Sequence, residues 1–270
     1  MTLEVLVAAM RQKDLNLHQK MNLKCNTVIA NQCDTWDYQE KEYEYGKVRM
    51  LSTGTRGVGA NRNFALNLAE SDILLFADED IEYYDGELKG VIQAFEQFPD
   101  ADMIFFDLDL MRDGKIHKKM GHGCGKLHFY QVLKYGTPYI AIKKQACDKY
   151  NLSFSHLFGG GARYSCGEDS LFIIDCLRKR LKMYSSPYVL GKCVQDTSSW
   201  FTGYNEKYIY DKGAWVACAF PKIKHLIKWY FIRKFALKSG ISFMRTAKIM
   251  NKGIAGFKTL TTYDQAKESI

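Results

Sequence analysis

The stretch Asp72-Ile73-Leu74-Leu75-Phe76-Ala77-Asp78-Glu79-Asp80 decides the fold, because five consecutive apolar residues end abruptly in three acids. An apolar run of this length is typical of a strand buried on both faces of a sheet. Side chains two positions apart on an extended chain point the same way, so Asp78 and Asp80 can converge while Glu79 faces away. Two adjacent carboxylates suit a hard cation such as Mg²⁺ or Mn²⁺. The pattern alone also fits a solvated acidic loop, and Asp107-Leu108-Asp109 repeats it.

Apolar runs of strand length alternate with segments of helical period on both sides of this stretch. The predicted strands are Leu3–Ala9, Thr27–Asn31, Val48–Ser52, Asp72–Ala77, Met103–Asp107 and Tyr139–Ile142. The spacing of Leu, Ala, Ile and Phe residues predicts helices over Arg62–Ala69 and Gly86–Phe98. This alternation predicts an α/β fold with a Rossmann-like, mostly parallel sheet flanked by helices, whose ligands bind beyond the carboxyl ends of the strands.

The composition is that of an ordinary globular enzyme, with 270 residues, 47% of them hydrophobic and 25% charged. No apolar run approaches the roughly 18 residues that a membrane-spanning helix needs. The first residues read as a strand and not as a signal peptide, because Glu4 interrupts a short apolar run that has no basic leader. Eight cysteines without a C-x-x-C pair predict reduced, structural thiols in a cytoplasmic protein.

The net charge of +8 is confined to a C-terminal tail. Between positions 221 and 258 there are ten Lys or Arg and no Asp or Glu, and without these ten the 38 basic residues of the chain fall to 28 against 30 acidic ones. The rest of the chain is nearly neutral, so it lacks the electrostatic attraction to phosphates on which nucleic-acid binding mainly depends. We therefore predict a catalytic domain over residues 1–220 and a basic helical tail over 221–270. The tail fits an anionic membrane surface, and it also fits a solvated helix packed back on the domain.

Two glycine-bearing segments offer further sites. The loop Thr55-Arg56-Gly57-Val58-Gly59-Ala60-Asn61-Arg62 opens a helix, where free backbone N–H groups and a guanidinium can bind an anion. In Phe158-Gly159-Gly160-Gly161 the glycines allow a ligand to approach the backbone closely. Glu168 and Asp169 follow in the first turn of another helix, where acids also serve as plain partners of the helix dipole.

Taken in order, these segments resemble the inverting glycosyltransferases of family 2, in particular small bacterial enzymes of surface-polysaccharide synthesis. The resemblance covers about Leu3 to Ala214 and includes a second strand ending in Asn31-Gln32-Cys33-Asp34, the Arg62-Asn63 pair, the D-x-D strand and Gly167-Glu168-Asp169. It implies a GT-A fold, a nucleotide-sugar donor (most commonly a UDP-sugar) and a glycan or lipid-linked acceptor. It also selects Asp78 and Asp80 over Asp107 and Asp109, because the family's metal motif ends the strand that follows the Arg-Asn helix.

The resemblance assigns a role to each candidate residue. Asp78 and Asp80 would hold Mn²⁺ or Mg²⁺ on the donor diphosphate, and Asp169 would be the general base, with Glu168 orienting hydroxyls beside it. The nucleotide-sugar would be bound by Asp34, Arg62, Asn63, Asp78, Gly160 and Gly161. Many relatives carry a histidine after the Glu-Asp helix as a further metal ligand. This chain has none there, and Asp196 is the candidate substitute.

Two other readings of the sequence stay open. A nucleotidyltransferase also uses paired Asp residues on a Rossmann-like sheet, but it would need a glycine-rich loop after the first strand, where Met10-Arg11-Gln12-Lys13 has no glycine. A non-catalytic protein that docks on a membrane or a nucleic acid through the basic tail would leave the two acidic sites without a role. For the enzyme we expect a cytoplasmic location with peripheral contact to the inner face of the cell membrane.

Overall fold

The computed structural model describes residues 1–112, 114–118, 123–194 and 203–269. Its strands are β1 (Leu3–Met10), β2 (Asn26–Gln32), β3 (Asp37–Tyr43), β4 (Gly46–Thr53), β5 (Ile73–Asp78), β6 (Ile81–Tyr83), β7 (Met103–Arg112), β8 (Lys115–Lys118), β9 (Gly125–Lys126), β10 (Ile140–Lys143) and β11 (Met183–Val194). Its helices are α1 (Leu17–Lys20), α2 (Val58–Leu68), α3 (Lys89–Gln97), α4 (Phe129–Val132), α5 (Lys144–Tyr150), α6 (Glu168–Arg178), α7 (Glu206–Ala219), α8 (Lys224–Ser239), α9 (Phe243–Thr259) and α10 (Tyr263–Ala266). Two 3₁₀ turns, η1 (Thr137–Tyr139) and η2 (Lys267–Ser269), complete the elements.

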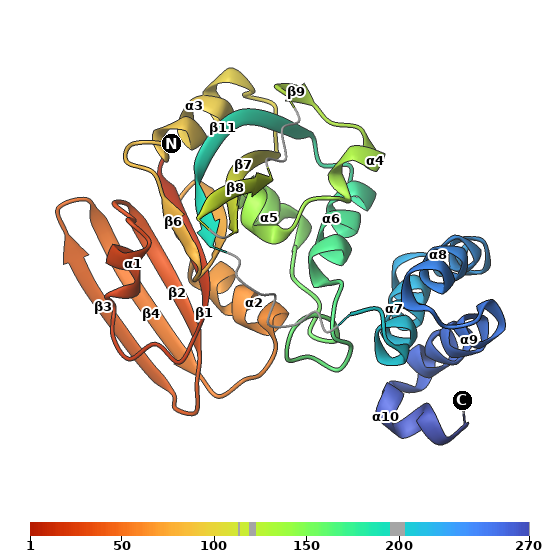
Figure 1. The fold of residues 1–270 in the computed structure, drawn as a ribbon. Coiled ribbons are helices and arrows are strands. Elements are labelled where there is room, and N and C mark those ends of the chain that lie inside the picture. Colours follow the sequence, from red (N-terminus) through yellow and green to blue (C-terminus); the bar gives the residue numbers. More distant parts are fainter. Residues whose placement is uncertain (113, 119–122, 195–202, 270) are drawn as a thin grey trace.

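One sheet runs through the molecule in the order β3-β4-β2-β1-β5-β10-β7-β11-β6 (Figure 1). The strands β4, β2, β1 and β5 run parallel to one another, as a Rossmann-like sheet requires, whereas the edge strand β3 is antiparallel to β4. The other half is mixed, because β10 runs antiparallel to both β5 and β7.

The two faces of the sheet carry separate apolar cores, as the period of two in a strand requires. Val5, Val7 and Ala9 of β1 pack with α1 and α3 on one face. Leu6, which lies between them in the sequence, packs with α2, α5 and α6 on the other face. The sheet is therefore covered on both sides, and its polar groups come to the surface where the strands end.

All six predicted strands and both predicted helices are present, but two long strands escaped the sequence reading. β3 is an edge strand with mostly charged, exposed side chains, so it lacks the alternation that marks a half-buried strand. β11 contains Pro187, and its pairing with β7 shifts register between Ser185 and Val189. A proline within an apolar run argues against a strand, although here a bulge in β11 accommodates the proline.

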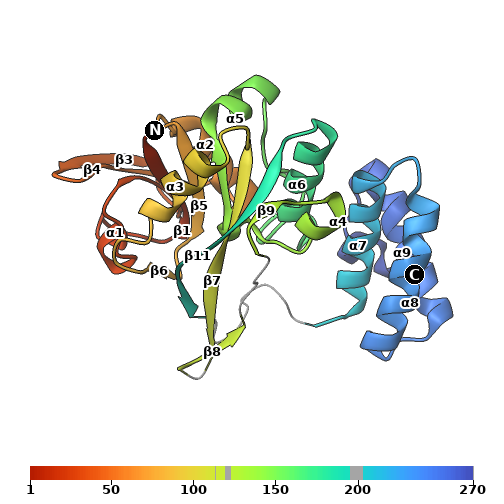
Figure 2. The ribbon, with the colours of Figure 1, turned by 90° about the horizontal axis from the view of Figure 1, so that it is seen from above.

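The helices α7, α8 and α9 form a unit beside the sheet, on the side of α6 that faces away from β3 and β4 (Figure 2). Their shared core includes Leu171 and Ile174 of α6, so the unit is packed onto the helix that carries Glu168 and Asp169. The predicted boundary at Pro221 lies in the connection between α7 and α8. Among the described residues, no helix combines the length and the apolar character required to span a bilayer.

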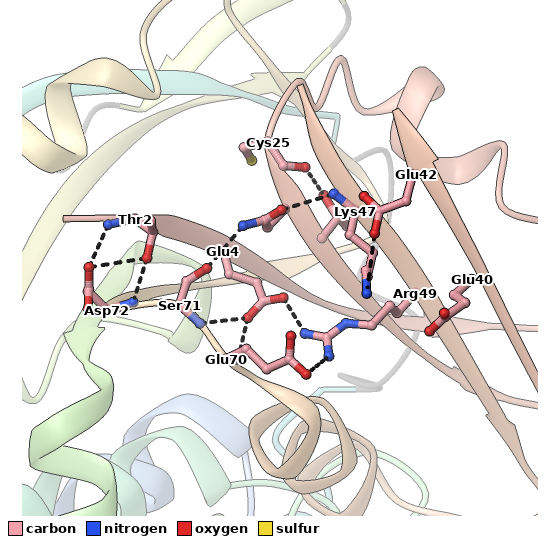
Figure 3. Close-up of polar contacts among 12 residues, drawn as sticks. Thr2, Glu4, Cys25, Glu40, Glu42, Lys47, Arg49, Glu70, Ser71 and Asp72 are labelled. Carbon is pink, nitrogen blue, oxygen red and sulfur yellow. Dashed lines mark hydrogen bonds and ion pairs between the residues drawn. The ribbon is translucent and has the colours of Figure 1, made fainter. Parts of the chain in front are cut away.

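A buried ion pair joins strands that are not neighbours in the sheet (Figure 3). Arg49 of β4 donates from Nη2 to Oε1 of Glu4 on β1 at 2.6 Å, and both residues are at most 4% exposed. The other oxygen of Glu4 accepts from the backbone N–H of Glu70 and of Ser71. Arg49 also pairs with the exposed carboxylate of Glu70 at 2.8 Å. The acid that interrupts the first apolar run thus fastens β1 to β4 and to the turn before β5.

We expect Arg49→Met to lower the free energy of unfolding by about 3–5 kcal/mol, because it leaves the Glu4 carboxylate charged and buried without its counter-ion. Lys24→Met is the matched control, since it breaks the exposed Lys24–Asp85 pair, and exposed ion pairs contribute little to stability. Urea unfolding of the two variants beside the wild type measures both values. Equal losses would contradict the structural role given to the buried pair.

Candidate active site

The start of α2 is fixed by contacts to the ends of two strands and to the glycine segment. The backbone N–H of Val58 donates to the carbonyl of Gly160 at 2.9 Å. The side-chain amide of Asn61 donates to the carbonyls of Ala9 and Ala30, where β1 and β2 end. Asn61 therefore holds the first turn of α2 against the carboxyl edge of the sheet, and Arg62 follows it at this edge.

Arg62 lies at the centre of three carboxylates. Its Nη2 donates to Oδ1 of Asp78 at 2.9 Å, at the end of β5. Its Nη1 donates to Oδ1 of Asp169 at 2.7 Å and to Oε1 of Glu168 at 3.2 Å, both in the first turn of α6. The guanidinium also lies 5.5 Å from the centre of the Phe154 ring. One buried cation thus gathers acids from segments about ninety residues apart in the sequence.

Burial and the neighbouring charges shift the pKa values of Arg62 and Glu168. Burial alone would lower the pKa of Arg62, but the adjacent carboxylates, Asp78 foremost, reverse this and raise it. Burial and the negative charge of Asp169 raise the pKa of Glu168 from 4.5 to about 7, although Arg62 opposes the rise. Three carboxylates therefore share one cation, and the most buried of them holds its proton near neutral pH. Carboxylates with pKa values shifted in this way cluster at catalytic sites.

Asp80 lies just beyond the end of β5, with Oδ2 at 3.4 Å from Sγ of Cys193. Burial and the charge of Asp78 raise the pKa of Asp80. A cation between the two carboxylates would relieve this repulsion, so the pair suits a hard divalent ion. Glu79 is turned away, since its carboxylate accepts from the backbone of Met10 and the side chain of Gln12. The described residues hold no cluster of three His, Cys, Asp or Glu suited to a metal, and Asp196 lies outside them.

The second D-x-D motif occupies a different environment. Asp107 and Asp109 lie inside β7, which continues to Arg112, and both are buried. Asp109 accepts a hydrogen bond from the Tyr84 hydroxyl at 2.9 Å. Its position within the strand contrasts with that of Asp78, the last residue of β5.

Two contacts at Glu168 and Asp169 had no signal in the sequence analysis. The hydroxyl of Thr137, in the turn η1, donates to Oδ1 of Asp169, the same oxygen that accepts from Arg62. At Gly159, φ is +110°, and a Cβ there would lie only 2.8 Å from the carboxylate carbon of Glu168. Glycine is therefore required at position 159 for backbone conformation and for space. A buried threonine after a glycine is too common a pattern to single out without the fold.

The residues predicted to bind the nucleotide-sugar are not all gathered at Arg62. Asp34 is exposed and pairs with Arg56. The side chain of Asn63 bonds to the backbone N–H and carbonyl of Phe154, which anchors the segment that follows α5. Gly160 caps α2 through its carbonyl, and Gly161 has a positive φ of +78°. Asp78 and Arg62 belong to the carboxylate cluster itself.

Comparisons with known proteins add an independent line of evidence. Residues 16–157 match the model of the family described as Glycosyl transferase family 2. That range includes Arg62, Asp78 and Asp80 and ends before Glu168. A search of curated protein sequences found no match.

Similar folds occur among solved structures. S. aureus TarS 1–349 in complex with UDP-GlcNAc aligns with a TM-score of 0.62 and 12% identity, over 98% of this chain and 75% of that one. The same protein in complex with UDP aligns with a TM-score of 0.59 and 12% identity, over 98% and 74%. At this identity the likeness shows the fold alone, which is the predicted GT-A fold.

The raised pKa of Glu168 gives stability a defined dependence on pH. The unfolded chain releases this proton near 4.5, whereas the folded chain holds it up to about 7. The folded state binds the proton more strongly in that window, so the free energy of unfolding falls as pH rises through it and then levels off. Glu168→Gln should abolish this fall, so between pH 4 and pH 8 the stability of the variant should rise by roughly 3 kcal/mol relative to that of the wild type.

Urea unfolding over that pH range, without metal or nucleotide, measures the effect. Glu96→Gln is the control, because this exposed carboxylate lies on α3 outside the cluster, and its profile should run parallel to the wild type. A Glu168→Gln profile that also runs parallel to the wild type would show that burial does not hold this proton.

Proposed function

The chain belongs to glycosyltransferase family 2, and from this premise we propose that it is an inverting glycosyltransferase. It transfers a sugar from a nucleotide-sugar to a hydroxyl of a glycan or lipid-linked acceptor in surface-polysaccharide synthesis. The observation that carries the proposal is the convergence of Asp78, Glu168 and Asp169 on the buried Arg62 at the carboxyl edge of the sheet. TarS, whose fold this chain shares, has been solved with UDP-GlcNAc and with UDP, which supports UDP as the nucleotide.

Asp169 is the general base of the proposed reaction. Its side chain is 32% exposed, whereas that of Glu168 is 11% exposed, so an acceptor hydroxyl reaches Asp169 more readily. Arg62 and Thr137 both donate to Oδ1, which fixes the orientation of the carboxylate. Asp169 takes the proton of the acceptor hydroxyl as the hydroxyl oxygen bonds to the anomeric carbon of the sugar. The bond from that carbon to the nucleoside diphosphate breaks on the opposite face, so the anomeric configuration inverts.

Asp78 and Asp80 are the residues that would hold Mn²⁺ or Mg²⁺, and when bound this ion would neutralise charge on the departing diphosphate. Asp78 is 37% exposed in its side chain and is balanced by Arg62, so it is open to a ligand while its charge is compensated. We keep Asp196 as the proposed third ligand. Asp34, Asn63, Gly160 and Gly161 complete the proposed donor site: Gly160 caps the helix that carries Arg62, and Asn63 anchors the segment leading to the glycines.

We also propose a cytoplasmic location with peripheral contact to the inner face of the cell membrane, supported by the ten basic residues between positions 221 and 258. The basic helices would bring the carboxylate cluster close to a lipid-linked acceptor. A nucleotidyltransferase and a non-catalytic docking protein are the competing functions. Neither calls for an acid beside Asp78 that is exposed enough to take a proton from an acceptor.

Asp169→Asn should leave UDP binding intact and reduce kcat by about 10²–10⁴-fold, because the amide keeps the shape but cannot accept the proton. Glu168→Gln should cost less, since an amide can still orient a hydroxyl. Asp175→Asn is the control, because Asp175 lies on the same helix but pairs with Lys179 away from the cluster. Kinetics with a UDP-sugar panel, with NMR of the product anomer, provide the measurement. A retained anomer, or normal turnover in Asp169→Asn, would exclude this mechanism.

UDP binding should require Mn²⁺ or Mg²⁺, and Asp80→Asn should weaken it at least about tenfold. Even the loss of a residue that only hydrogen-bonds a metal ligand typically costs that much. Asp109→Asn is the matched control from the other D-x-D motif and should bind UDP like the wild type. Titration calorimetry with the metal and with a chelator compares them. Equal UDP affinity in the presence of the chelator would refute the metal site, and a larger loss in Asp109→Asn would assign it to β7.

A further inference from the structure

The outer face of α8 is apolar although it faces solvent. Leu226, Tyr230 and Leu237 are 70%, 61% and 80% exposed. At about 100° per residue these three side chains lie within a narrow sector of the helix, and Arg233 falls in the same sector. The opposite side of α8 is fixed by packing, since Ile232 and Phe235 are buried in the core shared with α7 and α9. The packing of α8 therefore fixes which side of the helix faces solvent, and that side is apolar.

Aromatic residues widen this face toward α9. Trp229 is 53% exposed, and its ring stacks on that of Phe243 at 6.0 Å between centroids, with 17° between the planes. Phe243 is the first residue of α9 and is itself 47% exposed. We define the outer patch by its five residues, Leu226, Trp229, Tyr230, Leu237 and Phe243. Several large, exposed apolar side chains gathered on one face mark an interaction site more often than scattered single residues do.

Basic side chains border the aromatic rings. The ammonium of Lys228 lies 5.3 Å from the centre of the Trp229 ring, and that of Lys234 lies 5.8 Å from the centre of the Tyr230 ring. These lysines and Arg233 belong to the ten basic residues of positions 221–258, a segment without a single acid. Apolar and aromatic groups flanked by Lys and Arg are the chemistry that binds the interface of an anionic bilayer.

We propose that the outer patch docks the protein onto the surface of a bilayer containing anionic phospholipids. Leu226, Trp229 and Tyr230 enter the headgroup region, and Arg233 and Lys234 pair with lipid phosphates. A second copy of this chain fits poorly, because a two-fold contact through this face would set like charges against each other. The inference rests on the membrane contact of the proposed function, which it assigns to one defined surface, and it does not depend on which sugar is transferred.

Docking through α8 would also fix the position of the carboxylate cluster above the bilayer. The indole N–H of Trp215 on α7 donates to the carbonyl of Gly167, the residue before α6, at 3.3 Å. A Cβ at Gly167 would lie 2.3 Å from the same indole ring, so the two helices meet closely there. α7 packs on α8 and α9 in one core. The bilayer-facing helix and the helix that carries Asp169 are thus joined by direct packing.

The test is flotation of the full chain with vesicles made of phosphatidylglycerol and phosphatidylcholine in equal parts, compared with phosphatidylcholine alone. Binding should be confined to the anionic vesicles and should fall as salt rises, since the screening length shortens from about 10 Å at 0.1 M to about 3 Å at 1 M. Leu226→Ser/Trp229→Ser/Tyr230→Ser should bind at least about tenfold more weakly. Trp emission should shift to shorter wavelength with vesicles in the wild type but not in Trp229→Phe.

Point substitutions are preferable to removal of the tail, because α7 shares a core with α8 and α9. Without these two helices the buried residues Ile209, Tyr210 and Val216 of α7 would be exposed to solvent. Tyr38→Ser/Lys41→Ser is the matched control, since it removes exposed residues of similar kinds from β3, at the opposite end of the molecule from α8 (Figure 1). This control should bind vesicles like the wild type. Both variants should keep the wild-type melting temperature and UDP affinity, which separates this test from that of the proposed function.

Three results would overturn the proposal. The first is equal flotation with both kinds of vesicle or with none. The second is undiminished binding by the triple variant at an unchanged melting temperature. The third is sedimentation equilibrium in which the wild type forms a dimer and the triple variant does not, because this would assign the outer patch to a second copy of the chain.

Discussion

The arrangement of the candidate site depends on one buried guanidinium. Arg62 is 4% exposed and bonds to carboxylates from β5 and α6, two elements that would otherwise repel each other where they meet. Burying a cation is tolerable only where acids surround it, and burying acids together is tolerable only around a cation. The mutual requirement explains why Asp78 and Asp169 adjoin although strands and loops separate them in the sequence. It also leaves one carboxylate, Glu168, protonated near neutral pH.

The surroundings of Arg62 are built to hold it in place. Asn61 ties the first turn of α2 to the carbonyls that end β1 and β2, and Gly160 caps the same turn. Gly159 leaves room for the Glu168 carboxylate, and Thr137 restrains Asp169 from the side of η1. Three separate segments, the start of α2, the glycine segment and η1, therefore surround the two acids. Such support is what a site needs when small displacements of a reacting group reduce the rate strongly.

The features that the sequence predicted are those with local signals. Apolar runs marked β1 and β5, and the abrupt change from Ala77 to Asp78 marked the end of a strand. The sequence could not predict which charged residues pair with each other, because an ion pair such as Arg49–Glu4 depends on the order of strands in the sheet. The same holds for Thr137, whose contact with Asp169 spans 32 positions. Edge strands such as β3 are missed by sequence-based prediction for another reason, since their exposed charged residues carry no periodic apolar pattern.

The position of α6 connects the two halves of the molecule. Phe172 and Ile173 of this helix pack against the sheet, whereas Leu171 and Ile174 pack against α7, α8 and α9. Its first turn carries Glu168 and Asp169, so the acids sit where the sheet and the helical unit meet. A displacement of the helical unit would be transmitted to the first turn of α6, because closely packed interiors shift as bodies and deform little. The tail that looks separate in composition is therefore packed, together with α7, onto the helix that carries Glu168 and Asp169.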